Sequence, residues 1–169
     1  MTIRKQLKRL GFLAALAISL PGCAQDKTFD EMVDGLIDKS VPLVQPADCA
    51  GDTGVVFLDA RELREYQVSH IMDAIAVGYD DFSLDALAGV PKDAKIVVYC
   101  SVGYRSEKIG EKLQKAGYND VSNLYGGIFH WVNTGNEVYT DGHPTTEVHA
   151  YNKNWGQWLE EGGCTKIYK

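Results

Sequence analysis

A cysteine, a glycine and an arginine stand close together after the most apolar segment of the chain, in the stretch VVYCSVGYRSEKIG (97–110). The residues before Cys100 are β-branched and aromatic, which is typical of a buried strand, and a charged helical pattern opens near Ser106. The first turn of a helix has backbone N–H groups without intrahelical partners and the positive end of the helix dipole. A thiol placed there is favoured as the thiolate, so the spacing predicts a cysteine nucleophile at residue 100.

The residues that follow Cys100 could bind an anion. Arg105 would supply a fixed positive charge and a forked donor suited to an oxyanion, and Gly103 would let the loop curl without a Cβ in the way. The alternative is a structural cysteine that closes a strand. The loop therefore predicts five substrate-binding residues: Ser101, Val102, Gly103, Tyr104 and Arg105. Ser101, Val102 and Tyr104 would form an uncharged, partly aromatic rim. Arg105 is the only cation of the loop.

Alternating elements must position this loop. Strands separated by helices imply an α/β protein with a mostly parallel sheet covered on both faces, whose ligands bind beyond the carboxyl ends of the strands. The sequence predicts strands within 40–45 (an edge strand), 54–61, 73–78, 94–100 and 120–127, and helices within 28–38, 62–67, 83–90, 106–117, 128–135 and 154–163.

The chain opens with a pattern typical of export. Residues 1–22 carry four basic residues and then an apolar run, which predicts a secretory signal peptide too short to span a membrane as a helix. Its end, LPGC, resembles the bacterial lipobox, in which the cysteine is lipidated, although Pro21 departs from the small residue usually found there. We therefore expect lipidation of Cys23, a tether and helix over 23–39, and a location on the periplasmic side of a bacterial membrane. A plain cleavage site is the alternative.

Composition and charge narrow the partners. The 169 residues are 45% apolar and 24% charged, which suits one compact domain. The formal net charge is −6, and removal of residues 1–22 would leave 13 basic and 23 acidic residues, a net charge of −10. Nucleic acids and anionic lipid surfaces are therefore poor partners for the mature chain, and the predicted membrane contact is the lipid on Cys23 alone.

Three cysteines remain besides Cys23: Cys49, Cys100 and Cys164. In an oxidising compartment two of them can form a disulfide and one is left over. Cys100 lies in the reactive loop, so Cys49 and Cys164 are the natural disulfide pair, with two separate thiols as the alternative. The chain has no Cys-x-x-Cys pair, and its histidines lack metal-ligand spacing. The sequence therefore predicts neither a metal site nor a cofactor.

Three segments carry a family resemblance. CSVGYR (100–105) resembles the active-site loop of rhodanese-type sulfurtransferases. FLDARELREYQVSHIMDAIAV (57–77) is similar to the family's Asp-x-Arg, Glu-Tyr and His-Ile segment, and GYNDVSNLYGGIFHWVNTG (117–135) to its closing strand, double glycine and tryptophan-bearing helix. The match runs in the family's order over roughly residues 40–140.

The resemblance implies a rhodanese-like three-layer fold over 40–162, with a C-terminal tail over 163–169. It implies that Cys100 accepts a sulfane sulfur as a persulfide, from thiosulfate, a polysulfide or a persulfide, and passes it to a thiol acceptor. It also implies that Asp59 and Arg61 hold neighbouring loops in place rather than react, although a surface ion pair would read the same way.

Two other functions stay open from the sequence. Cysteine phosphatases and arsenate reductases also combine a cysteine, an anion loop and an arginine, but typically place the arginine one position further from the cysteine than Arg105 is from Cys100. A rhodanese-like binding module without turnover, at the membrane surface, is the second alternative.

Overall fold

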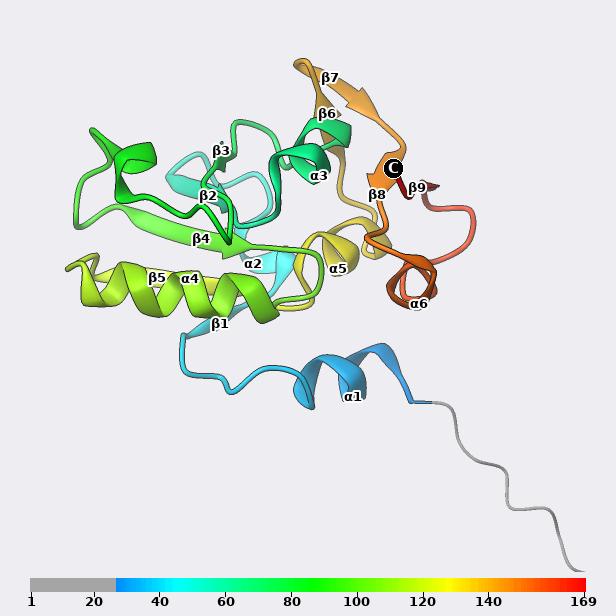
Figure 1. Ribbon diagram of the computed structural model, residues 1–169, viewed down its shortest axis with the longest axis horizontal. Helices are drawn as coiled ribbons and strands as arrows, with labels where there is room; N and C mark the ends of the chain where they lie inside the picture. Colours follow the sequence, from blue (N-terminus) through cyan, green and yellow to red (C-terminus); the bar gives the residue numbers. More distant parts are fainter. Residues whose placement is uncertain (1–26) are drawn as a thin grey trace, which may run out of the picture.

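The computed structural model describes residues 27–169 and contains one five-stranded parallel sheet flanked by helices (Figure 1). The predicted signal peptide over 1–22 and lipidation at Cys23 lie outside the described residues. All four strand pairings are parallel, which confirms the predicted α/β class. Across the sheet the strands run in the order β1 (Leu43–Val44), β5 (Asp120–Leu124), β4 (Lys95–Tyr99), β2 (Val55–Asp59) and β3 (Ile75–Ala76).

The central strand β4 shows why the fold has three layers, with the sheet between two layers of helices. Successive side chains of a strand point to opposite faces. Ile96 and Val98 pack in a cluster with residues of α4 (Tyr104–Lys115), whereas Val97 packs in a second cluster with residues of α5 (Gly127–Asn133). A run of apolar residues therefore buries both faces of β4, as in parallel sheets generally.

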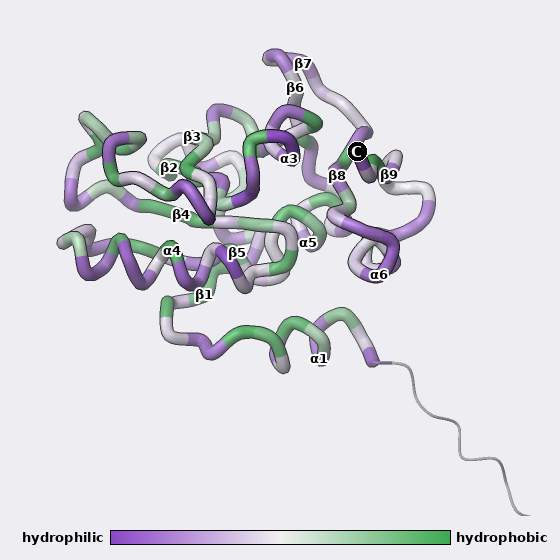
Figure 2. Tube along the Cα trace, viewed as in Figure 1, coloured by the Kyte–Doolittle hydropathy of each residue, from purple (hydrophilic) through white to green (hydrophobic). Residues whose placement is uncertain are grey.

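Helix α4 leads directly out of the candidate loop. Hydrophobic and hydrophilic residues alternate along it with the period of an amphipathic helix, so its apolar stripe faces the sheet (Figure 2). It begins at Tyr104, two residues before the predicted start at Ser106, because Gly103 adopts a left-handed conformation (φ 111°) and serves as the N-cap.

The shorter elements surround this frame. Helix α1 (Phe29–Asp34) begins with the capping box predicted from Thr28 and Glu31, whose side chains each accept from the other's backbone N–H at 3.2 and 2.9 Å. None of the helices within residues 27–169 is long and apolar enough to cross a membrane. The remaining short elements are α2 (Pro46–Cys49), α3 (Leu63–Val68) and the 3₁₀ turn η1 (Leu84–Leu87).

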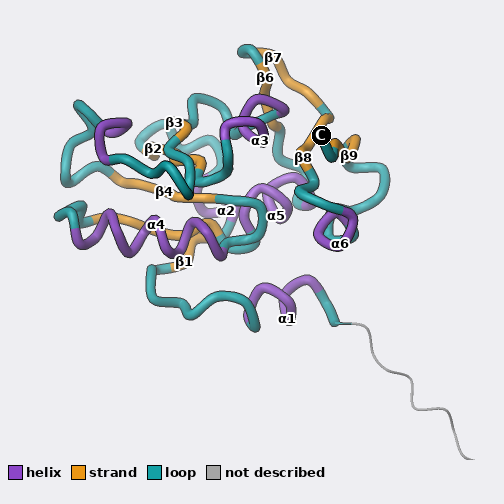
Figure 3. Tube along the Cα trace, viewed as in Figure 1, coloured by secondary structure: helices purple, strands orange, loops and turns teal. Residues whose placement is uncertain are grey.

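The C-terminal part differs most from the sequence prediction. The helix expected within 154–163 is the single turn α6 (Lys153–Gly156), and the expected tail over 163–169 contains a strand, β9 (Thr165–Ile167), paired with β8 (Glu147–His149). Figure 3 shows these short strands among long loops at one side of the molecule. Strands of three residues are too short to show periodicity, and so they were not predicted. A second short pair is β6 (Val138–Thr140) with β7 (His143–Thr145).

The predicted disulfide between Cys49 and Cys164 is not present in the structure, where both residues are free cysteines. Cys49 is buried at the end of α2, and its thiol donates to the carbonyl oxygens of Gln45 and Pro46 at 3.5 and 3.7 Å. Burial raises the pKa of the Cys49 thiol to about 11, and burial also raises the pKa of Cys164. Both are therefore expected to remain protonated, unreactive thiols at neutral pH.

Candidate active site

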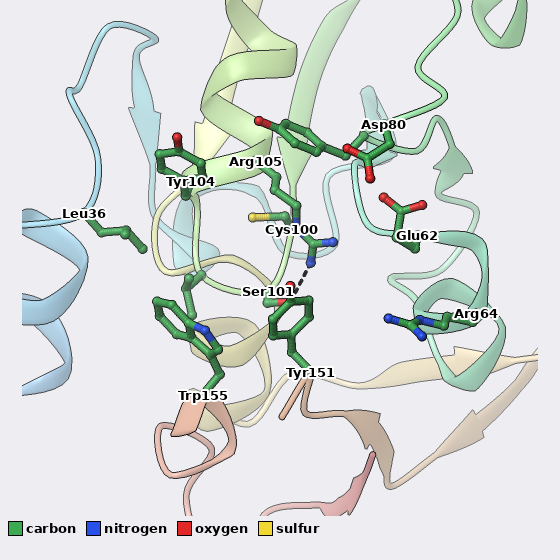
Figure 4. A pocket seen from close by; sticks show the side chains of 12 residues that line it. Leu36, Glu62, Arg64, Asp80, Cys100, Ser101, Tyr104, Arg105, Tyr151 and Trp155 are labelled. Carbon is green, nitrogen blue, oxygen red and sulfur yellow. Dashed lines mark hydrogen bonds between the residues drawn. The ribbon is translucent and has the colours of Figure 1, made fainter. Parts of the chain in front are cut away.

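Cys100 follows the carboxyl end of the central strand β4, where parallel sheets place their ligands. The residue is 1% exposed and lies at the wall of a cavity of about 400 Å³ (Figure 4). Four of the five predicted binding residues line this cavity, and the fifth, Gly103, contacts the sulfur instead. The lining consists of Leu36, Glu62, Arg64, Tyr79, Asp80, Cys100, Ser101, Val102, Tyr104, Arg105, Tyr151 and Trp155.

The carbonyl groups of Cys100 and Ser101 point toward α5. The backbone N–H groups of Ile128 and Phe129, in the first turn of α5, donate to the carbonyl oxygens of Cys100 and Ser101 at 2.8 and 3.1 Å. The N–H of Gly103 then donates to Cys100 Sγ at 3.2 Å. The sulfur therefore accepts a hydrogen bond from the backbone of its own loop, and its predicted role as a nucleophile stays a prediction.

Two buried polar residues that were not predicted fix this geometry. The Ser106 hydroxyl lies 2.7 Å from Asn123 Oδ1 and 3.5 Å from Cys100 Sγ, and its single proton favours the shorter contact. Asn123 Nδ2 donates to the Gly103 carbonyl at 3.0 Å. Since Asn123 stands near the end of β5, beside β4, its place on a neighbouring strand is the signal that could have identified it.

Arg105 has a partner that sequence reasoning missed. Its guanidinium donates to both carboxylate oxygens of Glu65, at 2.7 and 2.9 Å, and to Ser101 Oγ at 3.0 Å. The side chain of Glu65 is fully buried and that of Arg105 is 16% exposed. Arg105 is therefore neutralised by a two-point ion pair rather than free to meet a substrate, and its predicted binding role stays a prediction.

Each member of this pair alters the other's ionisation. Burial of Glu65 acts to raise its pKa, but the hydrogen bonds and charge of Arg105 outweigh it and hold the pKa below its ordinary value of 4.5. Burial of Arg105 acts to lower its pKa, but Glu65 keeps that pKa above its ordinary value. The pair stays ionised throughout the neutral range.

The Glu65 pair predicts a loss of stability in acid. A carboxyl whose pKa is lowered by folding stabilises the fold above its unfolded pKa, and this contribution is lost as the pH falls through the folded pKa. We expect Glu65→Gln to lower the free energy of unfolding by about 1–3 kcal/mol near neutral pH. The deficit relative to the unaltered protein should shrink below pH 4.5. Urea unfolding of both proteins at several pH values measures this difference in the free energy of unfolding.

Glu161→Gln is the matched control for this prediction, because Glu161 is exposed and forms no salt bridge within residues 27–169. Its deficit should be near zero at every pH. A Glu65→Gln deficit that stays constant through the acid range would show that the carboxylate's charge contributes nothing.

The rim of the cavity is more charged than the sequence predicted. Glu62, Arg64 and Asp80 line it together, so Arg64 adds a second cation to Arg105, which is the only cation of the loop itself. Among residues 27–169 none of these three side chains forms a salt bridge. They come from α3, the residue before it and the loop after β3, segments that fold to the same edge of the sheet.

The C-terminal segment contacts the site through His149 and Tyr151. His149, at the end of β8, is 1% exposed and lies with Nδ1 4.0 Å from Glu65 Oε1. The Tyr151 N–H donates to His149 Nδ1 at 3.2 Å, and burial lowers the pKa of His149, so the ring is neutral. The Tyr151 ring in turn lies 5.5 Å from the Arg105 guanidinium carbon. This segment thus contacts the Glu65–Arg105 pair twice, through the buried His149 at Glu65 and through the Tyr151 ring at Arg105.

Asp59 and Arg61 lie apart from the cavity as a fully buried ion pair. Arg61 Nη2 lies 2.6 Å from Asp59 Oδ2 and also donates to the Ser69 carbonyl at 2.6 Å. The pair joins the end of β2 to the segment after α3. A surface ion pair, the alternative considered for these residues, is wrong because both side chains are 0% exposed.

Gly127, the first residue of α5, lies against the loop, and its φ of 57° is left-handed. A Cβ there would collide with the Cys100 carbonyl oxygen and lie 2.7 Å from the Ser101 carbonyl carbon. We expect Gly127→Ala to destabilise the protein by about 2–4 kcal/mol, through backbone strain and overpacking, and to slow any reaction of Cys100. Urea unfolding and thiol alkylation rates check this.

The control for Gly127→Ala is Gly135→Ala. Gly135 is also left-handed (φ 85°), but in the described part of the chain no atom lies within 4 Å of the place a Cβ would take. This variant should show only the backbone strain, about 1–2 kcal/mol, with the thiol's alkylation rate unchanged. Equal effects of the two variants would contradict a steric role for Gly127.

The fold and the site together define an α/β protein whose cysteine lies in a loop between the central strand of a parallel sheet and a helix. The rhodanese-like domain model matches residues 47–134, just over half of the chain, and this protein therefore belongs to the rhodanese-like domain family.

Curated relatives are similar over part of their length. The tRNA uridine(34) hydroxylase of Erwinia tasmaniensis is 32% identical over 118 residues, which cover 66% of this chain and 33% of that protein. The Listeria welshimeri protein of the same name is 38% identical over 86 residues, 46% of this chain and 26% of that protein. The chain thus spans a third or less of these relatives.

Solved structures share the fold. The rhodanese-like domain of an Anabaena sp. protein has a TM-score of 0.54 and 25% identity, covering 60% of this chain and 80% of that one. The thiosulfate sulfurtransferase of Pseudomonas aeruginosa has a TM-score of 0.54 and 24% identity, covering 78% of this chain and 25% of that one.

Proposed function

We propose that this protein is a sulfurtransferase. Cys100 takes a sulfane sulfur from a small donor, holds it as a persulfide and passes it to a thiol acceptor. The observation that carries the proposal is the Gly103 N–H directed at Cys100 Sγ at 3.2 Å, in a loop whose carbonyls are turned toward α5. A persulfide bears negative charge on sulfur, and a fixed N–H donor stabilises such charge.

The two transfers balance without a cofactor. The Cys100 thiolate attacks the outer sulfur of the donor, a new S–S bond forms, and the donor's own S–S bond breaks with its electron pair leaving on the donor fragment. In the second step an acceptor thiolate attacks the outer sulfur of the Cys100 persulfide and releases the Cys100 thiolate. Within residues 27–169 no group of three His, Cys, Asp or Glu residues is placed to hold a metal ion.

The phosphatase or arsenate-reductase alternative has less support. Such an enzyme needs an arginine fork facing the oxyanion, whereas Arg105 is already bound by both oxygens of Glu65. The tRNA hydroxylase activity named for the relatives is not proposed here, since the chain covers a third or less of them and has a net charge of −6.

Intact-protein mass spectrometry tests the proposal. The purified protein is incubated with thiosulfate and, separately, with polysulfide. We expect a gain of one sulfur that maps to Cys100 and disappears with cyanide. No gain from either donor, with iodoacetamide showing that the thiol is free to react, would contradict sulfur transfer and support the binding-module alternative.

We also propose, from the sequence pattern of residues 1–23, export and lipid anchoring through Cys23. Membrane fractionation of a bacterial host expressing the full chain tests it. Cys23→Ser should move the protein from the membrane fraction to the soluble fraction, and an unchanged distribution would contradict the anchor.

A further inference from the structure

The cavity around Cys100 has two unlike sides. In Figure 4 the sulfur points toward the side that carries Leu36, Tyr104 and Trp155, whereas Glu62 and Asp80 lie on the opposite side. The sulfur of a donor must come within bonding reach of Sγ, so the rest of the donor extends along the apolar and aromatic side. This side favours a carbon-containing body over a strongly hydrated anion.

The charged side of the cavity does not favour a dianion either. Glu65 cancels the charge of Arg105. The remaining charged residues of the lining are Glu62 and Asp80 against Arg64 alone, a net negative rim. A donor with two negative charges is repelled by such a rim, while a donor of low charge is not.

The size of the cavity agrees with an organic donor. Its volume of about 400 Å³ falls in the range of roughly 300–1,000 Å³ that small organic ligands occupy. Much of the apolar wall comes from outside the family match over 47–134: Leu36 precedes the match, and Tyr151 and Trp155 follow it. These residues thus lie outside the part of the chain that the family model matches.

Tyr151 is held at the cavity at a cost in backbone strain. Its φ of 61° is left-handed, which is unfavourable for a tyrosine. The hydrogen bond from its N–H to the buried His149 and the placement of its ring over Arg105 maintain this conformation. Strain kept at a cavity wall points to a role for the ring in that cavity.

We infer that the sulfur donor is a small organic persulfide with an apolar or aromatic body, rather than thiosulfate. This inference rests on the proposed sulfurtransferase function. The Cys100 thiolate attacks the outer sulfur of R–S–SH and forms a new S–S bond to it. The S–S bond of the donor breaks with its electron pair leaving on the inner sulfur, and the products are the thiolate R–S⁻ and Cys100–S–SH. The charge is conserved, and neither oxidant nor reductant is needed. Tyr151 and Trp155 bind the body R.

Loading rates of Cys100 with two probes, benzyl persulfide and thiosulfate, test the inference by time-resolved intact-mass measurement. We expect benzyl persulfide to load Cys100 faster. Tyr151→Gly removes the ring and tolerates the left-handed backbone, so it should fold and slow benzyl persulfide about tenfold while changing thiosulfate less than about twofold. Asp141→Gly makes the same backbone change at another left-handed residue (φ 48°), outside the cavity, and should alter neither rate.

A second pair of variants tests the charged rim. Glu62→Gln combined with Asp80→Asn should raise the thiosulfate rate about fivefold and leave benzyl persulfide unchanged. Asp120→Asn, at the opposite end of the sheet where β5 begins, is the control and should change neither rate.

Faster loading by thiosulfate, or equal slowing of both donors in Tyr151→Gly, would overturn the inference while leaving sulfur transfer intact. A thiosulfate rate that does not rise when the rim is neutralised would overturn its electrostatic part. No sulfur from either donor on a thiol that alkylates normally would overturn sulfur transfer itself, and the inference with it.

Discussion

Cys100→Ser is expected to lose at least about 10³-fold in sulfur transfer, because a hydroxyl is a far weaker nucleophile toward sulfur than a thiolate. Folding should be nearly unaffected: the serine hydroxyl can accept the Gly103 N–H that Sγ accepts now, and the change of stability should be about 1 kcal/mol or less. The measurement is transfer of sulfur from donor to an acceptor thiol, with urea unfolding alongside.

Cys164→Ser is the matched control, since it makes the same thiol-to-hydroxyl change at a half-buried cysteine outside the Cys100 cavity. It should retain full transfer. If Cys100→Ser retained activity, or if the two variants lost it equally, Cys100 would not be the sulfur carrier.

Asp59→Asn is expected to lower the free energy of unfolding by about 3–5 kcal/mol, because it leaves the Arg61 guanidinium buried without its counter-charge. Burial of Arg61 acts to lower its pKa, yet the charge and hydrogen bonds of Asp59 keep that pKa above its ordinary value. Arg61 therefore stays charged, and its Nη1 already has no hydrogen-bond partner among residues 27–169. Urea unfolding near neutral pH measures the loss.

Two further variants separate charge burial from other effects. Replacing Asp59 and Arg61 together, by Asn and Met, should recover much of the loss, since no unpaired charge then remains buried. Asp52→Asn removes one partner of the exposed pair between Asp52 and Lys95 and should have a far smaller effect. A loss at Asp59 no larger than that at Asp52 would contradict a supporting role for the buried pair.

The sequence by itself determined the position of the loop that carries Cys100 and the strand and helix that hold it. Cys100, Gly103 and Arg105 lie within six consecutive residues, so their proximity does not depend on long-range folding. Strand β4 is recognisable because both its faces are buried, and α4 because its apolar residues recur with helical period. Patterns of this kind involve residues close together in the sequence, so they can be recognised without a structure. They predicted the α/β class and showed the family resemblance.

The tertiary structure alone decided what surrounds that loop. Glu65 stands 40 positions before Arg105, and only the tertiary fold brings its carboxylate to the guanidinium whose charge it cancels. Tyr151 and Trp155 belong to short elements without periodicity, so no local pattern marks them as walls of the cavity. Partners far apart in sequence are selected by shape and charge in three dimensions. The loop that carries Cys100 was therefore predictable, whereas the character of its pocket was not.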